Sequence, residues 1–183
     1  MTIDPQQASA MLADVDSVVA RVKQSRIYRR SGDIFIMWGA LHVLRHVLFP
    51  LLPIFAHGGW VLLDLVGIAA TLLMLRGAQG FGQRSGWRWI ALYILFYGFG
   101  YVWSDVIGGM RERQLIAFWP TLFQFGYAVA GLWFGWAFLV IGLGAAGATV
   151  GAYLLWPSES YGLAITLINA GALVAAGLWM RRA

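Results

Sequence analysis

Four ionisable side chains fall within two apolar stretches of the sequence, where such residues are rare. His42, Arg45 and His46 have the i, i+3, i+4 spacing that places side chains on one face of a helix. Asp64 lies in the next apolar stretch. A charged Arg or Asp at the centre of a bilayer costs about 2.5–3.5 kcal/mol, so each needs a partner or a water-filled cavity. Arg45 and Asp64 are both expected about one helical turn below the same membrane surface. This common depth predicts an ion pair between neighbouring helices.

Three kinds of chemistry are compatible with this group. The first is a structural ion pair beside two hydrogen-bonded histidines. The second is a path for a small solute or for protons, because histidine titrates near neutral pH; Asp105 lies at the same expected level as Asp64. The third is a metal or haem site, with His42 and His46 as ligands and Asp64 or Asp105 as a third.

The metal reading is the weakest of the three, and we expect no cofactor. The positive charge of Arg45 in the same pocket repels a metal ion. Haem held by two histidines normally takes them from facing helices, and no other apolar stretch contains a histidine. The chain has no cysteine, which excludes thiolate metal sites and cysteine nucleophiles.

The composition indicates that these residues are carried by membrane helices. Of 183 residues, 60% are hydrophobic and 11% are charged, whereas a soluble domain carries about 25% charged residues. A helix needs about 20 apolar residues to span a bilayer. We therefore predict an all-α membrane bundle of six transmembrane helices, in a domain covering residues 32–183. The expected spans are approximately 33–55, 60–75, 87–106, 115–133, 136–156 and 161–179.

Two details of this map depend on single residues. The apolar block from 115 to 156 is too long for one span, so a tight turn is expected at Phe134–Gly135. The first span either ends or bends at Pro50, and the sequence leaves this open. Tryptophans fall near the ends of the spans, as expected at membrane interfaces, and only Trp38 lies inside one.

The distribution of basic residues predicts the orientation. Ten of the 13 lysines and arginines lie on the side of the two chain ends, Arg111 and Arg113 lie on the other side, and Arg45 lies within a span. By the positive-inside rule, both termini face the cytoplasm of a bacterial cell, and the protein is a multi-pass protein of the inner membrane. The net charge of +5 follows from this topology, so we expect no nucleic-acid partner.

Residues 1–31 are predicted to form an amphipathic cytoplasmic or interfacial helix. Its apolar residues Leu12, Val15, Val19 and Val22 recur at helical spacing, and basic residues cluster toward its end. Two roles are open. The helix either binds the membrane surface or a partner, or it packs on the protein's own cytoplasmic side.

Glycines in the fifth span form a misleading motif. The spacing GxGxxG at residues 142–147 lies inside an apolar span, without the strand and acidic residue of a nucleotide site. Small residues that let helices approach closely are the better interpretation. The expected packing positions are the pairs Gly131 with Gly135 and Gly147 with Gly151, facing a helix of this chain or of a second copy.

Two further polar residues lie in apolar spans, Gln124 in the fourth and Asn169 in the sixth. Interhelical hydrogen bonds, at roughly 1 kcal/mol or less each, account for both. The sequence contains no Ser-His-Asp order, no phosphate-binding loop and no carboxylate pair suited to acid–base catalysis, so we expect a protein without enzymatic activity.

The organisation resembles small, uncharacterised multi-spanning bacterial inner-membrane proteins. The segments that carry the resemblance are Ser25–Gly32 (SRIYRRSG), Trp38–Gly39 and Gly177–Arg182 (GLWMRR). The resemblance implies no activity and no functional residue. We expect a non-catalytic accessory or assembly subunit, whose partners are the lipid bilayer and a membrane protein or further copies of itself. The alternatives are a transporter or channel that uses the ionisable cluster, and then a metal- or haem-binding membrane protein.

Overall fold

A computed structural model describes residues 5–52, 59–76 and 86–182 of the chain. Over these residues the chain forms six α-helices and no strand, which confirms the all-α prediction. A six-residue π-helix, η2, follows α3, and a short 3-10 helix, η3, precedes α6. The elements are α1 (Pro5–Leu51), α2 (Gly59–Arg76), α3 (Gly86–Tyr101), η2 (Val102–Ile107), α4 (Glu112–Phe134), α5 (Trp136–Leu155), η3 (Ser158–Ser160) and α6 (Tyr161–Arg182).

Three of the described helices, α4, α5 and α6, are long and apolar enough to cross a membrane. Two others contain shorter apolar segments, Val61–Leu75 in α2 and Ala91–Ile107 in α3 and η2. Length and composition therefore indicate a membrane protein with three candidate spans. The other three predicted spans remain a prediction.

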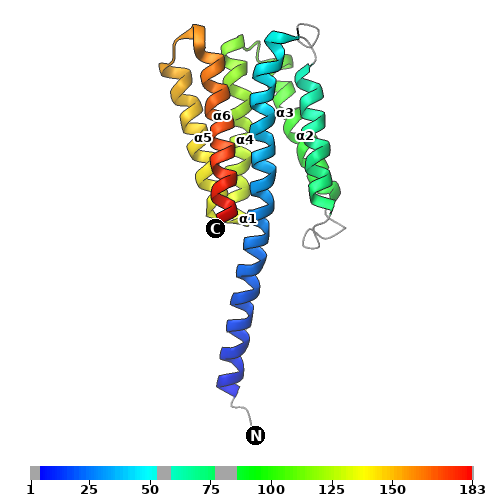
Figure 1. Ribbon diagram of the computed structural model, residues 1–183, viewed down its shortest axis with the longest axis vertical. Helices are drawn as coiled ribbons and strands as arrows, with labels where there is room; N and C mark the ends of the chain where they lie inside the picture. The colour runs from blue at the N-terminus through cyan, green and yellow to red at the C-terminus, as the bar shows by residue number, and fades with distance from the viewer. Residues whose placement is uncertain (1–4, 53–58, 77–85, 183) are drawn as a thin grey trace.

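Figure 1 shows the helices side by side in an elongated bundle, with α1 much longer than the rest. The chain runs up one helix and down the next, so the C-terminal end of α6 lies at the end of the bundle where α1 enters. Helix α1 packs along α6 and also against α2. Helix α4 packs along α5 and against α3, and α5 packs against α6.

The contact between α1 and α6 is close because glycines face it. A Cβ atom added to Gly32 would lie 2.7 Å from the carbonyl oxygen of Gly177, and one added to Gly39 would lie 2.8 Å from Val174 Cγ2. The largest group of buried side chains lies between α1, α5 and α6. Its large members are Tyr28, Phe35, Trp38, Phe138, Leu173 and Met180.

Two features of α1 bear on the sequence predictions. The helix runs past Pro50 and ends at Leu51; residues 53–55 of the expected first span lie outside the described residues. It also crosses residue 31, the expected end of the amphipathic helix, without interruption. The predicted N-terminal helix and the predicted first span are thus one helix of 47 residues.

The turn between α4 and α5 is formed by Gly135, whose φ of 119° and ψ of 154° disfavour any side chain. On the two sides of the turn, Gly131 of α4 faces α5 and Gly142 of α5 faces α4. An added Cβ would lie 2.5 Å from Leu139 N at the first position and 2.5 Å from Gln124 O at the second. These glycines allow α4 and α5 to run antiparallel in close contact.

Candidate functional site

The ionisable cluster is assembled around Asp64 of α2. The hydroxyl of Tyr97, on α3, donates a hydrogen bond of 2.9 Å to Asp64 Oδ2. Arg45 and His42, on α1, are close enough to influence the charge of Asp64. Three of the five predicted cluster residues therefore lie near one another, on the neighbouring helices α1 and α2. A direct ion pair between Arg45 and Asp64 stays a prediction.

A hydrogen-bonded seam below the cluster joins α1 to α2. Trp38 Nε1 donates to Thr71 Oγ1 at 3.1 Å, and the Thr71 hydroxyl donates to the Gly67 carbonyl at 2.8 Å. The Trp38 ring covers Gly67, where an added Cβ would lie 2.6 Å from the ring. His42 Nδ1 lies 2.9 Å from the Trp38 carbonyl oxygen. The one tryptophan expected inside a span is thus buried with its polar atom satisfied.

The other two predicted cluster residues lie against different elements. His46 Nδ1 is 3.5 Å from the hydroxyl of Thr166, on α6. Asp105 lies in the π-helix η2 and accepts a hydrogen bond from the neighbouring Ser104 hydroxyl. In the part of the chain that the structure describes, no three His, Cys, Asp or Glu side chains are grouped to hold a metal ion.

A second polar group lies in the core of α4, α5 and α6. The side-chain amide of Gln124 donates to Thr149 Oγ1 at 3.0 Å and to Asn169 Oδ1 at 2.6 Å. All three side chains are buried. Thr149 and Asn169 also donate to carbonyl oxygens of their own helices, at 2.9 and 2.8 Å. The group ties three helices together, and Thr149 is the member that the sequence analysis missed.

Two arginines bind carbonyl oxygens at the C-terminal ends of neighbouring helices. Arg113 donates to the carbonyl oxygens of Tyr153 and Trp156, at 2.9 and 2.7 Å, at the C-terminal end of α5. Its guanidinium carbon lies 4.5 Å from the centre of the Tyr161 ring. At the opposite end of the bundle, Arg30 donates to the Met74 carbonyl at 2.7 Å. Cations at helix C-termini are favoured by the free carbonyls and the helix dipole.

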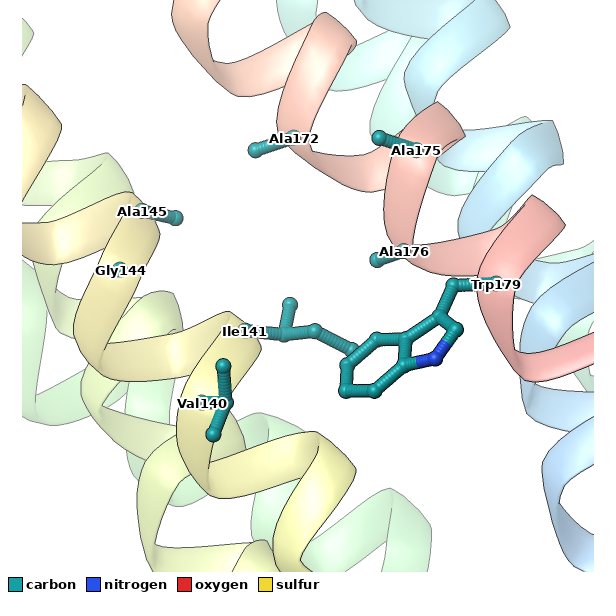
Figure 2. Close-up of a pocket in the computed structure, with 8 residues that line it drawn as sticks. All are labelled: Val140, Ile141, Gly144, Ala145, Ala172, Ala175, Ala176 and Trp179. Atoms are coloured by element: carbon teal, nitrogen blue, oxygen red, sulfur yellow. The ribbon is translucent and has the colours of Figure 1, made fainter. Parts of the chain in front are cut away.

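Two grooves on the bundle have mainly apolar walls. The groove between α2 and α3 has a volume of about 480 Å³, and its walls are aliphatic apart from Asp64, Thr71, Tyr93 and Tyr97. The groove between α5 and α6 has a volume of about 340 Å³. Figure 2 shows small side chains on its two walls and Trp179 at one end. Such walls suit hydrocarbon better than a polar solute.

The predicted packing glycines fall into two groups. Gly131 and Gly135 lie in close contacts within the chain, as an added Cβ at either would collide with neighbouring atoms. Gly147 and Gly151 are on α5 with open space where a Cβ would point. The packing role of Gly147 and Gly151 stays a prediction.

Residues 9–26 of α1, which we call the N-terminal arm, carry a group of exposed apolar side chains outside the bundle. All of these residues are exposed, and Figure 1 shows this part of α1 extending beyond the end of the bundle. At 1.5 Å per residue the arm is about 27 Å long. Its large apolar residues are 44–66% exposed: Met11, Leu12, Val15, Val18, Val19 and Val22.

Comparison of the chain with protein-family models, with curated proteins and with solved structures gives no match. No activity is therefore carried over from a relative. The function has to be argued from the arm, the ionisable cluster and the bundle themselves.

Proposed function

We propose that the protein is a non-catalytic accessory or assembly subunit of the bacterial inner membrane, which binds a partner through its N-terminal arm. The observation that supports this is the exposure of the arm. Six large apolar side chains are exposed on the part of α1 that extends beyond the end of the bundle. Exposed apolar surface of this kind is typical of an interaction site.

The same proposal includes the finer topology. All six helices would cross the membrane, with α1, α2 and α3 joining the three candidate spans. Both ends of the chain would be cytoplasmic, since α1 enters the bundle at the end where α6 finishes and ten of 13 basic residues belong to that side. A reporter enzyme fused after residue 183 tests this. Activity of a periplasmic reporter at that point would contradict the proposal.

The arm would bind as a preformed helix. Isolated helices of this length are marginal in water because nucleation is costly. Here the arm continues α1, which is already fixed by α6 and α2. Less conformational entropy is therefore lost on binding, and more of the buried apolar surface contributes to affinity.

Affinity purification of the full-length protein from native membranes tests the docking role. The variant carries Val15→Lys and Val19→Lys on the apolar face, and the matched control carries Ser17→Lys on the opposite face of the same exposed segment. We expect partner proteins to be recovered with the wild type and the control and lost with the variant. Recovery of the same proteins with all three would contradict the proposal.

A transporter is a second candidate, favoured by the hydrogen bond from Tyr97 to Asp64 and by the nearby charged or titratable side chains of Arg45 and His42. An intramembrane carboxylate coupled to a histidine is a common element of proton pathways. In proteoliposomes, Asp64→Asn would then abolish proton or solute flux while the protein still elutes as a folded species. Equal flux for the wild type and Asp64→Asn would remove this candidate.

A further inference from the structure

The groove between α5 and α6 opens toward the surroundings of the bundle. Ala145 and Ala176, in its floor, are buried, whereas Val140, Gly144 and Ala175, on its rims, are exposed. Figure 2 shows open space between the two walls, because the side chains on them are small. Both helices are candidate membrane spans. In a membrane, the medium against this groove is therefore lipid hydrocarbon.

The dimensions of the groove suit a single hydrocarbon chain and not a further helix. Along α6 the groove extends from Ala172 to Trp179, which is about 10 Å at 1.5 Å per residue. A helix with its side chains is itself about 10–12 Å wide. The ring of Trp179 extends across one end of the groove toward α5, and its centroid lies 5.2 Å from that of Trp136. A helix laid along the groove would meet these two rings, whereas a flexible chain can bend past them.

The end of the groove at Trp179 is positively charged. Arg182 follows Trp179 by three residues, so it lies one turn further along the same side of α6, and it is exposed. Arg181 is paired with Asp33 of α1 at 3.2 Å, so Arg182 adds a further positive charge. Helix α5 begins at this end with no acidic residue in its first turn, and the positive end of its dipole adds to the same field.

We propose that this groove binds an acyl chain of an anionic phospholipid, whose phosphate lies at Arg182. Tryptophans are enriched at the level of the lipid headgroups, so Trp136 and Trp179 place the charged end of the groove at that level. The glycerol end of the chain then lies at Trp179, and the chain continues toward Ala172. This site is separate from the N-terminal arm, and it does not depend on the proposed accessory role.

The charges at the end of the groove favour an anionic headgroup over a zwitterionic one. Both kinds of headgroup carry a phosphate that an arginine can bind. A zwitterionic headgroup also brings an ammonium group, which Arg182 and the N-terminal end of α5 repel. Basic sites between helices near the membrane surface are accordingly sites for anionic lipids.

The two walls of the groove distinguish this site from the remaining lipid-facing surface. A chain in the groove contacts α5 and α6 together, whereas a chain on a single exposed helix face has protein atoms on one side only. Each additional pair of atoms in contact adds a small dispersion attraction, and these attractions sum along the chain. A lipid in the groove is therefore held at both its chain and its headgroup.

Native mass spectrometry of the full-length protein tests the headgroup contact. The protein is freed of lipid in mild detergent and titrated with dioleoyl phosphatidylglycerol or with dioleoyl phosphatidylcholine, which has the same chains. We expect about tenfold tighter binding of the first phosphatidylglycerol, because a hydrogen bond to a charged group contributes about 1.5–3 kcal/mol. Arg182→Gln should remove this preference. Lys23→Gln, which removes the same charge from the exposed arm, is the matched control and should keep it.

A second pair of variants tests the chain. Gly144→Leu fills the groove from the α5 wall, since an added Cβ there meets no atom. Gly147→Leu is the control, because it also points into open space on α5 but does not line the groove. We expect weaker binding of phosphatidylglycerol to Gly144→Leu and unchanged binding to Gly147→Leu.

Three results would overturn the inference. The first is equal binding of the two lipids by the wild type. The second is equal loss of the preference in Arg182→Gln and Lys23→Gln, which would indicate attraction by net charge alone. The third is equal binding of phosphatidylglycerol by Gly144→Leu and Gly147→Leu, which would leave the headgroup contact without a chain in the groove.

Discussion

Replacement of Gly135 by alanine tests the turn on which the packing of α4 against α5 depends. The φ of 119° at this residue costs a residue with a side chain about 1–3 kcal/mol. The new Cβ would also collide with the hydroxyl of Tyr28 and lie 2.7 Å from Gln24 Nε2. Overpacking of this kind costs about 1–3 kcal/mol. The structure therefore predicts a loss of about 2–6 kcal/mol in the free energy of unfolding.

The assay is equilibrium unfolding of the purified protein in mixed micelles of mild detergent and dodecyl sulfate, followed by tryptophan fluorescence. Gly144→Ala is the matched control, because an added Cβ there meets no atom and alanine favours a helix by about 0.5–1 kcal/mol. Adding Tyr28→Phe to Gly135→Ala removes the hydroxyl and should recover part of the steric cost, but none of the backbone cost. Equal stability of Gly135→Ala and Gly144→Ala would refute the reasoning.

Three further predictions concern the polar contacts of the bundle. Asn169→Leu removes the acceptor of the buried Gln124 amide, so the free energy of unfolding in the same assay should be about 1–2 kcal/mol lower. A variant that also carries Gln124→Leu should recover part of this loss. Arg113→Gln removes the charged donor at the end of α5; we expect a loss of about 1–3 kcal/mol, and no change in the unfolding midpoint would contradict this role. If Arg45 and Asp64 form a pair, Arg45→Met alone should destabilise the protein more than Arg45→Met with Asp64→Leu, because the single variant leaves a carboxylate uncompensated; equal losses would argue against the pair.

Local features of the fold were predictable from the sequence because they depend on local chemistry. Long apolar stretches predicted an all-helical fold, and the structure confirms this over the residues that it describes. The turn at Gly135 lies where an overlong apolar block needs a residue without a side chain. In contrast, the continuity of α1 across residue 31 was not foreseen. A change from polar to apolar composition marks a change of surroundings, and a helix can continue through it.

The parts of the candidate site that depend on tertiary neighbours were not predictable. Asp64 and Arg45 stood out because charge is rare in apolar spans, but Tyr97 did not, since a tyrosine in such a span is unremarkable by itself. Its hydrogen bond to Asp64 depends on where α3 lies beside α2. The contact of His46 with Thr166 likewise depends on α1 packing against α6, the helix most distant from it in sequence. Helical periodicity specifies which residues share a face and leaves the choice of neighbour open.

The packing of α1 along α6 has a consequence for how the protein is made. About 110 residues separate the end of α1 from the start of α6, and a ribosome adds about 5–20 residues per second. For roughly 5–20 seconds during synthesis, the glycine-lined face of α1 therefore has no α6 to pack against. During that interval Gly32 and Gly39 are open to contact with other helices. Nascent chains halted before residue 161 should accordingly expose this face of α1 to other proteins, and full-length chains should not.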